Sequence, residues 1–371
     1  MKAGWQLKAI GDVCEVVNGG TPKTGVSDYW DGPHQWITPA EMGKRSSPYI
    51  ERTERTITDA GMRNSSARLL PKQSVILSSR APIGHLVINT AAMATNQGCK
   101  GLVPRNGLDS KYLYYYLAGI VPLLNDLGSG ATFKELSGGK LKEVPVPVAP
   151  LPEQHRIVAI LDEAFDGIAT AKANAEKNLQ NARALFESVL DSAHGENAPL
   201  GNYVTIKTGK LDANAAIEDG AYPFFTCAKE IYAIDKYAFD CEAILLAGNN
   251  AVGDFNVKHY TGKFNAYQRT YVITALDENL LSYRFLYFQM LKSLKRFKEQ
   301  SVGAGTKFLK LGMIKELEIS LPPIAKQLET ASMLDSLLKE TQRLESLYLQ
   351  KLTALDDLKK SLLHQAFSGQ L

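Results

Sequence analysis

Residues 150–195 read PLPEQHRIVAILDEAFDGIATAKANAEKNLQNARALFESVLDSAHG, and the chain contains this stretch twice. The second copy, PPIAKQLETASMLDSLLKETQRLESLYLQKLTALDDLKKSLLHQAFSG, occupies residues 322–369. Residues 173 positions apart match without a gap, so that Gln154 meets Gln327 and Leu185 meets Leu358. A period this long indicates a duplicated unit rather than a solenoid of short repeats.

Both copies predict a long helix. Each starts after a proline pair and ends near a glycine, Gly195 or Gly369, as helices commonly do. The predicted heptad seam of the first helix is Ile157, Leu161, Ala164, Ile168, Ala171, Ala175, Asn178, Ala182, Leu185 and Val189. That of the second is Thr330, Leu334, Leu337, Thr341, Leu344, Tyr348, Lys351, Leu355, Leu358 and Leu362. Seams of this length predict an antiparallel intramolecular coiled coil, and the alternative is two ordinary amphipathic core helices.

Two further blocks complete the chain. Residues 1–149 and 197–321 share an order of strand and turn signals with little identity, while residues 150–196 and 322–371 hold the helices. The chain therefore predicts an α+β protein in which two mixed α/β domains are joined by the paired helices as a pseudo-twofold internal repeat. Residues 27–43 predict a hairpin with polar tips, and the tyrosines of residues 110–124 predict a helix whose aromatics pack on the sheet.

Composition narrows the class of protein. The 371 residues contain 4 scattered cysteines, which fit reduced thiols in a cytoplasmic protein, and no apolar run long enough for a signal peptide or a membrane span. The net charge of +3 is uneven, because the helices are acidic to neutral and the other two blocks carry the basic excess. This excess is a modest indication of a polyanionic partner.

The LPEQ entry at residues 151–154, its counterpart IAKQ at 324–327, the closing LLHQAFSGQL and the GGTPKT…YWDG…WITP run together resemble the specificity subunit of type I restriction–modification systems. The resemblance covers the whole chain. It departs at residues 192–195, where Ser-Ala-His-Gly stands in place of Ala-Phe-Ser-Gly, and at the second entry, which lacks the acidic residue. These departures imply unequal docking at the helix ends.

The resemblance implies two target recognition domains that each read one half of a bipartite double-stranded DNA site. It implies helices that set the unread spacer and dock two methyltransferase subunits, with motor-nuclease subunits completing the complex. S-adenosylmethionine, ATP and Mg²⁺ are then expected on the partner subunits and no cofactor or metal on this chain. The sequence itself contains no convincing nucleotide-binding, methyltransferase, hydrolase or nuclease signature, so we expect a chain that is not a catalyst.

Several polar residues are candidates for DNA contact. In the loops GSGATFKEL and GAGTKFLKL, Thr132 with Lys134 and Thr306 with Lys307 suit a phosphate, although a plain turn capping a helix is an equal alternative. Arg80 and, at the equivalent turn, Asn249 and Asn250 suit guanine and adenine edges. Further candidates are Lys23, Thr38, Lys210 and Arg269, and candidates for partner docking are Gln154, Gln327 and Phe367.

Two other functions remain open at this point. A coiled-coil adaptor that joins two protein clients explains the helices but not the basic excess of the other blocks. An enzyme with an unrecognised site in one domain is weaker still, and binding of labelled S-adenosylmethionine to the isolated chain tests it.

Overall fold

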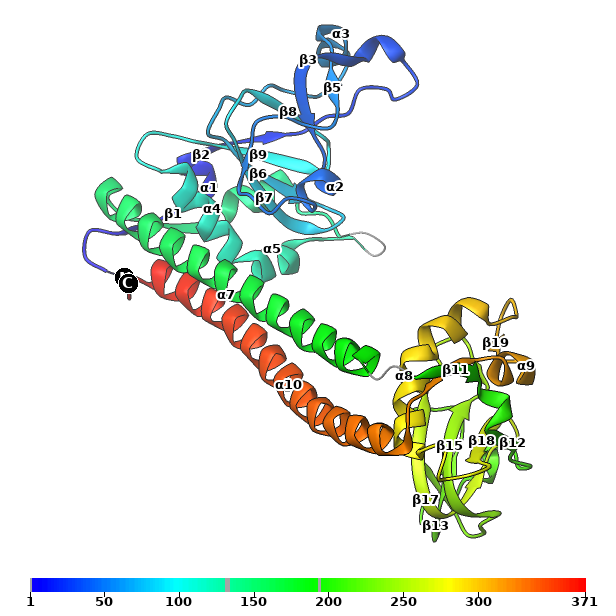
Figure 1. Cartoon of the computed structure of the whole chain (residues 1–371). Coiled ribbons are helices and arrows are strands. Elements are labelled where there is room, and N and C mark those ends of the chain that lie inside the picture. The colour runs from blue at the N-terminus through cyan, green and yellow to red at the C-terminus, as the bar shows by residue number, and fades with distance from the viewer. Residues whose placement is uncertain (1, 131–133, 193–194) are drawn as a thin grey trace. The chain divides into compact units, whose positions relative to one another are not determined.

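The computed structural model describes residues 2–130, 134–192 and 195–371 (Figure 1). The chain divides into two compact units, the first formed by residues 1–173 and 351–371 and the second by residues 174–350. Each unit contains one mixed α/β domain and the adjoining parts of two long helices, α7 (Leu151–Ser192) and α10 (Ile324–Ser368). The predicted α+β class and internal repeat are confirmed, whereas the predicted domain boundaries stay a prediction.

The first unit contains ten strands and a series of short helices among its described residues. The strands are β1 (Gln6–Ala9), β2 (Cys14–Asn18), β3 (Trp30–Ile37), β4 (Tyr49–Ile50), β5 (Thr56–Ile57), β6 (Val75–Ser79), β7 (Ile83–Asn89), β8 (Met93–Thr95), β9 (Cys99–Pro104) and β10 (Pro145–Val148). The helices are α1 (Ile10–Val13), α2 (Pro39–Met42), α3 (Asp59–Arg63), α4 (Ser110–Gly119), α5 (Val121–Leu127) and α6 (Gly138–Glu143), with a 3₁₀ turn at Ser27–Tyr29.

The second unit follows the same plan. Its strands are β11 (Glu196–Pro199), β12 (Val204–Thr208), β13 (Tyr222–Phe225), β14 (Tyr232–Ile234), β15 (Phe239–Ala247), β16 (Asn249–Asn250), β17 (Val257–Ala266), β18 (Thr270–Ala275), β19 (Lys307–Phe308) and β20 (Glu318–Leu321). Its helices are α8 (Tyr283–Gln300) and α9 (Leu311–Lys315), with 3₁₀ turns at Leu200–Asn202 and Ala213–Ala215.

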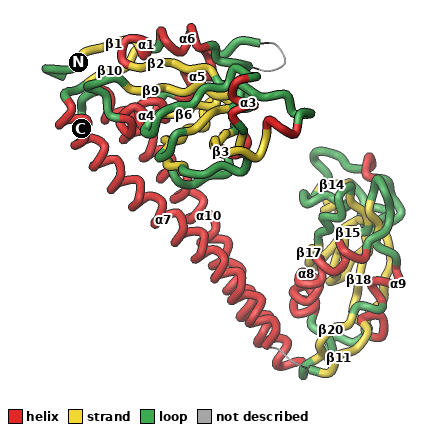
Figure 2. The backbone as a smooth tube through the Cα atoms, turned by 90° about the horizontal axis from the view of Figure 1, so that it is seen from above, coloured by secondary structure: helices red, strands yellow, loops and turns green. Residues whose placement is uncertain are grey.

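The two main sheets share one strand order. In the first unit it is β2-β9-β6-β7-β4, and in the second it is β12-β18-β15-β17-β13-β14. Figure 2 labels β2, β9 and β6 of the first sheet and β18, β15 and β17 of the second. The first four strands of each order pair antiparallel, and the next strand, β4 or β13, runs parallel to its neighbour. A separate antiparallel ribbon, β1 with β10 or β11 with β20, joins the start of each domain to its end. The duplication therefore includes the domains, where the sequence alone shows it only faintly.

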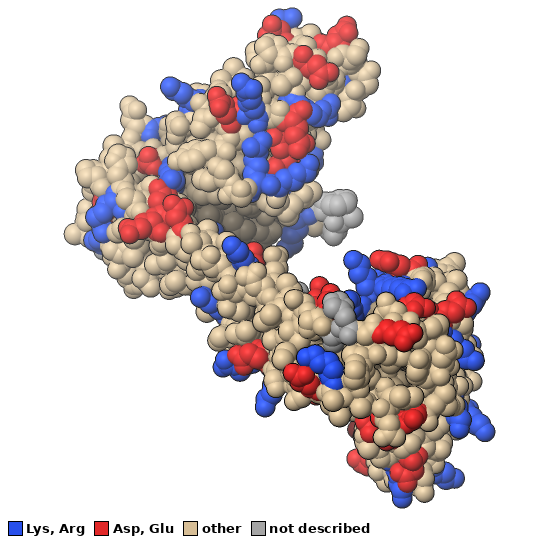
Figure 3. All heavy atoms as spheres, viewed as in Figure 1, with Lys and Arg blue, Asp and Glu red and all other residues tan. Residues whose placement is uncertain are grey.

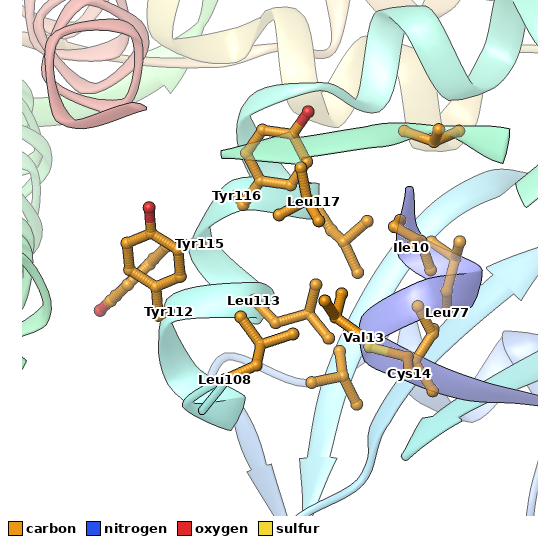
Figure 4. Close-up of a cluster of buried hydrophobic side chains, with 14 of the residues drawn as sticks. Ile10, Val13, Cys14, Leu77, Leu108, Tyr112, Leu113, Tyr115, Tyr116 and Leu117 are labelled. Atoms are coloured by element: carbon orange, nitrogen blue, oxygen red, sulfur yellow. The ribbon is translucent and has the colours of Figure 1, made fainter. Parts of the chain in front are cut away.

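Helix α4 joins the first sheet to the long helices. Asp109 caps its first turn by accepting hydrogen bonds from the backbone N–H groups of Lys111 and Tyr112. Leu113 lies among the buried aliphatic side chains from the sheet and α1 (Figure 4). The sequence predicts that the tyrosines pack on the sheet, but two of them also contact a long helix. The rings of Tyr112 and Tyr116 lie 5.0 and 5.2 Å from that of Phe367 on α10. The aromatic face of α4 is thus a contact surface for the paired helices.

The hairpin predicted for residues 27–43 is wrong. Residues Trp30–Ile37 form the single strand β3, which lies between β5 and β8, and α2 follows it. The indoles of Trp30 and Trp36 meet edge to face at 5.1 Å, and both side chains are buried. The partner strands come from distant parts of the chain, so no local turn signal could reveal this pairing.

The long helices pack against each other within each unit, and their contacts fit an antiparallel pair. In the first unit, Leu161 of α7 joins Leu363 and Ala366 of α10 in one buried cluster. In the second unit, Leu190 of α7 joins Ala331 and Leu334 of α10. The start of α7 therefore meets the end of α10, and the end of α7 meets the start of α10.

The seam departs from the predicted register in the middle of both helices. Leu185 and Leu358, predicted as seam residues, are 53% and 47% exposed. The polar seam positions Asn178 and Lys351 are exposed as well, while the leucines that follow them, at positions 179 and 352, are half-buried. A step of four replaces a predicted step of three in each copy, because a straight α-helix repeats every 3.6 residues rather than every 3.5.

Candidate nucleic-acid interface

Turns that are distant in sequence come together at one edge of the first unit. We call this group, residues 19–23, 79–82, 95–98 and 134–136, the first loop edge. The backbone N–H of Ser79 donates to Gly98 O (2.8 Å), and that of Leu136 donates to Ser79 O (2.9 Å). The N–H of Gly20 donates to Thr95 O (2.9 Å), which adds the end of β2. Backbone hydrogen bonds thus fix four segments that present polar side chains.

Charged side chains of the first loop edge form a small network. The guanidinium of Arg80 lies 3.5 Å from the Glu135 carboxylate, and Lys100 Nζ lies 3.8 Å from its other oxygen. Lys100 is almost fully buried, whereas about a third of the Arg80 side chain is exposed. Glu135 therefore balances two cations, and Lys134 beside it is exposed with no ion-pair partner among the residues that the structure describes.

The second unit repeats this backbone arrangement. We call residues 209–211, 248–250, 266–269 and 306–309 the second loop edge. The N–H of Gly248 donates to Arg269 O (2.9 Å), and the N–H of Leu309 donates to Gly248 O (2.9 Å). These bonds match those of the first edge and make Asn249 the counterpart of Arg80. The prediction that these residues occupy equivalent turns agrees with this geometry, and their role in DNA contact stays a prediction.

The side chains of the second loop edge are different. Asn249 pairs with Phe308, and Asn250 pairs with Lys307, across the short ladder of β16 and β19. The Arg269 guanidinium lies 5.2 Å above the Phe308 ring, a cation–π contact. Phe308 thus occupies the place that Glu135 has in the first edge. One backbone frame carries two unlike sets of side chains.

The remaining predicted contact residues lie at or beside these edges. Thr38 caps α2, where its hydroxyl accepts a hydrogen bond from Glu41 N, and the next residue, Pro39, lies against Gly98. Lys23 is exposed two residues beyond Thr21, whose hydroxyl accepts a hydrogen bond from the Asn96 amide at 2.9 Å. Lys210 is exposed at the end of β12, Thr306 precedes β19, and Thr132 lies outside the described residues.

Sequence reasoning missed a set of side-chain hydrogen bonds in the second unit. Lys258 Nζ donates to Ala228 O (2.6 Å) and to Asn256 Oδ1 (2.5 Å), and Asn256 Nδ2 donates to Cys227 O (2.8 Å). Burial lowers the pKa of Lys258. This lysine therefore supports a turn, a role that a basic residue in a strand does not reveal in sequence.

Gln154 and Gln327, the two glutamines predicted to dock a partner, are buried inside their own units. Gln154 Oε1 accepts from Asp109 N (2.8 Å), and Gln154 Nε2 donates to Gly107 O (2.8 Å) and Ala149 O (2.7 Å). Gln327 makes the same three bonds in the second unit, with Ser282 N, Leu280 O and Pro322 O. Both side chains are fully buried, so direct partner contact by them has no support here. They tie each long helix to the cap of α4 or α8.

Phe367, the third docking candidate, is half-buried against Tyr112 and Tyr116. A shallow pocket beside it is lined by Lys360, Leu363 and His364 of α10. Phe367 therefore shapes a surface at the end of α10 that a partner can reach.

Two features are absent from the part of the chain that the structure describes. No group of three or more metal-ligating side chains gathers there, and no helix in that part has the length and apolarity to cross a membrane. Basic and acidic side chains are interspersed on the face seen in Figure 3, without a large area of one sign. The cationic groups at the two loop edges are local features of an otherwise mixed surface.

Two α+β domains with matching loop edges, each tied to a long helix, define a class of two-domain recognition proteins. A chain from a structural study of complex assembly and conformational transition of the type I R-M system has the same fold over its whole length. It covers 100% of this chain and 99% of its own, with a TM-score of 0.77 at 15% identity.

The sequence places the chain within that class. Residues 2–180 and 196–354 both match the family described as type I restriction modification DNA specificity domain, and the chain belongs to this family. It is 38% identical over 187 residues to the type I restriction enzyme MjaIX specificity subunit of Methanocaldococcus jannaschii, an alignment of 50% of this chain and 43% of that protein. It is 41% identical over 172 residues to the EcoDI specificity subunit of Escherichia coli, covering 46% and 37%. The chain thus spans less than half the length of these curated relatives.

Proposed function

We propose that this chain is the non-catalytic, sequence-reading subunit of a type I restriction–modification complex. The observation that carries the proposal is the pair of family domains, each with the same loop-edge backbone and different side chains on it. A reader of one symmetric site needs two like edges, whereas unlike edges suit an asymmetric, bipartite site. Each unit then reads one half of the site.

Binding at each edge combines two kinds of contact. Lys23, Lys134, Lys210 and Lys307 are exposed or half-exposed amines that suit phosphates, which position the duplex without reading it. Arg80 has the geometry to pair with the O6 and N7 acceptors of guanine, and the amides of Asn249 and Asn250 can pair with adenine. The side-chain oxygen Oδ1 of Asn250 already accepts from Val252 N (2.9 Å) and Asp254 N (3.1 Å), so Asn250 offers only its N–H₂ donor, which suits the N7 acceptor of adenine, and not a bidentate pair.

The long helices supply the protein-binding part of the function. Leucines at positions 185, 347, 349 and 358 are exposed by about half or more on α7 and α10. Exposed apolar side chains can contribute to a protein interface where they form a contiguous patch. We assign this surface to two methyltransferase subunits, with motor-nuclease subunits completing the complex, and S-adenosylmethionine, ATP and Mg²⁺ to those partners.

A gel-shift titration with duplex DNA in the presence of the methyltransferase subunits tests the proposal. We expect affinity to fall steeply as salt rises, because each neutralised phosphate releases counterions. Methylome sequencing of cells with and without the gene should then show one bipartite motif that depends on it. Affinity that is insensitive to salt, with no motif lost, would contradict the proposal.

The exposed leucines also favour the second candidate, an adaptor that joins two protein clients without DNA. The two candidates differ in the loop edges, which an adaptor leaves unused. Charge-reversal of Lys134 and Lys307 should abolish the gel shift while leaving co-purification of the methyltransferase subunits intact. Co-purification of the methyltransferase subunits with no gel shift, even for the unaltered chain, would point to the adaptor.

A further inference from the structure

A groove of about 860 Å³ opens on the main sheet of the second unit, along the edge strand β12 and the residues that lead into β15. Its apolar lining includes Ile206, Phe239 and Tyr271, and its polar lining includes Lys207, Lys210 and Lys236. No carboxylate is among the lining residues. Three amines around an aromatic floor suit a ligand that combines a flat apolar part with negative charge.

The aromatic part of the groove is held in place. The Phe239 ring stacks on the buried Phe264 ring with centroids 5.1 Å apart and an angle of 14° between planes. The Tyr271 hydroxyl donates to Leu309 O (2.8 Å). Tyr237, also in the lining, is 45% exposed, and the Lys263 amine lies over its ring, 4.8 Å from the centroid. A preorganised aromatic surface lowers the entropic cost of binding a planar group.

The amines are available for a ligand. Lys207, Lys210 and Lys236 are all exposed, and none has an ion-pair partner among the residues with described positions. Elsewhere in this unit an exposed amine can be neutralised by a neighbouring carboxylate, as Lys229 is by Asp254 (2.9 Å), whereas no carboxylate lines the groove. The groove is therefore a local site of positive charge.

Among the described residues of the first unit, buried side chains fill the space that corresponds to this groove. Gly19 and Gly209 are equivalent, since a side chain at either would collide with the backbone of the neighbouring turn, so Val17 is the counterpart of Lys207. Val17 is 9% exposed and packs with Leu70, which lies against Gly101 of the neighbouring strand. In the second unit the strand carries a lysine at this position and the face is open.

The groove is continuous with the second loop edge. Lys210 belongs to both, and the N–H of Gln268 donates to Leu211 O (2.8 Å) beside it. Gln268 is followed by Arg269, which faces Phe308 in the edge. A DNA strand bound at the second loop edge therefore runs close to the mouth of the groove.

We propose that the groove takes one unstacked nucleotide of the DNA that the second loop edge binds, with its base against Tyr237 and Phe239 and its phosphate near Lys207 and Lys236. Aromatic side chains stack on any base, and lysines bind the backbone phosphate without regard to sequence. Removing a base from the duplex has an energetic cost, which is smallest for a base that is already unpaired. This inference rests on the proposed DNA-binding function.

The test compares two duplexes of random sequence that differ by one extra, unpaired 2-aminopurine nucleotide. The full chain, with the methyltransferase subunits present as in the gel-shift titration, is titrated with each duplex, and anisotropy and 2-aminopurine fluorescence are recorded. We expect the bulged duplex to bind about tenfold more tightly than the matched one, with quenched fluorescence, as one base–aromatic stack allows. Tyr237→Ala should remove the quenching and most of the preference, Lys207→Ala should weaken the preference, and Lys295→Ala, on the exposed face of α8, should leave both unchanged.

The outcomes separate the two proposals. Binding of neither duplex would overturn the DNA-binding function itself. Binding of both with equal affinity, or a preference that survives Tyr237→Ala, would overturn the groove alone and leave the loop edges in place. Circular dichroism of Tyr237→Ala checks that the variant is folded.

Discussion

At the scale of single residues, the matched glutamines show how the duplication is used. Gln154 and Gln327 each make three hydrogen bonds to backbone groups and are fully buried. A polar side chain is stable in such a place only when its donors and acceptors are all satisfied. The identity of this residue in both copies follows from the identity of the contacts.

Replacing one glutamine should destabilise only its own unit. We expect Gln154→Ala to lower the free energy of unfolding of the first unit by about 3 kcal/mol, because backbone groups are left buried without partners. All three tryptophans, Trp5, Trp30 and Trp36, lie in that unit, so tryptophan fluorescence in urea reports it selectively.

Two variants serve as controls for this experiment. Gln180→Ala, at an exposed position of the same helix, should change the unfolding free energy by less than about 0.5 kcal/mol. Gln327→Ala should leave the tryptophan transition in place and shift only the circular dichroism of the second unit. Equal shifts of the tryptophan transition by Gln154→Ala and Gln327→Ala would contradict the prediction that each glutamine stabilises only its own unit.

The chain termini contribute a pH-dependent contact in the first unit. Glu153 lies beside Arg156 and Lys2, and both cations also donate to Leu371 O (Figure 1). Hydrogen bonds from Arg156 and Lys2 lower the pKa of Glu153 from 4.5 to about 2. Since the folded-state pKa is the lower one, this stabilisation is present above pH 4.5 and is lost as pH falls toward 2.

Glu153→Gln should therefore lower the urea midpoint of the tryptophan signal at neutral pH. The decrease should become smaller as the pH falls below 4.5. The measurement is the difference between wild type and variant across that range. A difference that stays constant on acidification would show that the carboxylate charge does not contribute.

Arg80 and Asn249 provide a reciprocal test of readout. Because they occupy equivalent turns in different units, Arg80→Ala should relax one half of the methylated motif and Asn249→Ala the other half. Loss of one bidentate base contact costs about 1–3 kcal/mol of discrimination. Methylome sequencing of cells that carry each variant gives the result, and a change of the same half by both would contradict separate readers.

At the scale of elements, the packing of α7 decides whether Leu185 or its neighbour Phe186 contributes more to the stability of the second unit. Phe186 packs on Phe288 of α8 with ring centroids 5.7 Å apart, whereas Leu185 is 53% exposed. A strict heptad favours Leu185, and the observed helix geometry favours Phe186.

Phe186→Ala should lower the stability of the second unit by about 2 kcal/mol through lost burial, and Leu185→Ala by less than about 0.5 kcal/mol. Circular dichroism in urea reports the change, and the tryptophan transition of the first unit is the internal reference. A larger effect of Leu185→Ala would restore the predicted register.

At the scale of the whole chain, the duplication gives two units that share a backbone framework and carry different loop edges. The sheets keep one strand order, while the loop edges and the segments inserted before β6 and β15 differ. Under the proposed function, exchange of one domain on this framework is expected to change one half of the DNA site and leave the other half unchanged. This is the physical reason to place recognition in loops on a rigid scaffold.

Lengthening the helices tests their role in the proposed spacing. One heptad inserted into α7 after Ala173 and into α10 after Gln350 adds about 10 Å, or about three base pairs, to each helix. We expect the unread spacer of the methylated motif to lengthen while both half-sites stay the same. An unchanged spacer in the methylome would contradict the proposal that the helices set the distance between the half-sites.

The fold was predictable where the signal is periodic or repeated. The helices and their pairing follow from an apolar period and a fixed offset, both of which are visible without coordinates. The equivalence of Arg80 and Asn249 was also within reach, because both follow a buried strand and precede a turn. The hairpin over residues 27–43 failed because β3 pairs with strands that are remote in sequence.

The duplication, the paired helices and the family can be recognised without the structure, because each depends on the order and spacing of residues along the chain. Other features are visible only in the folded chain. Glu135 lies between Arg80 and Lys100, and the two glutamines are buried and hydrogen-bonded to backbone groups. A groove opens beside β12 in the second unit, and buried side chains fill the corresponding space in the first. Contacts of this kind join residues that are far apart in sequence. They depend on strand order and side-chain packing, which no local pattern encodes.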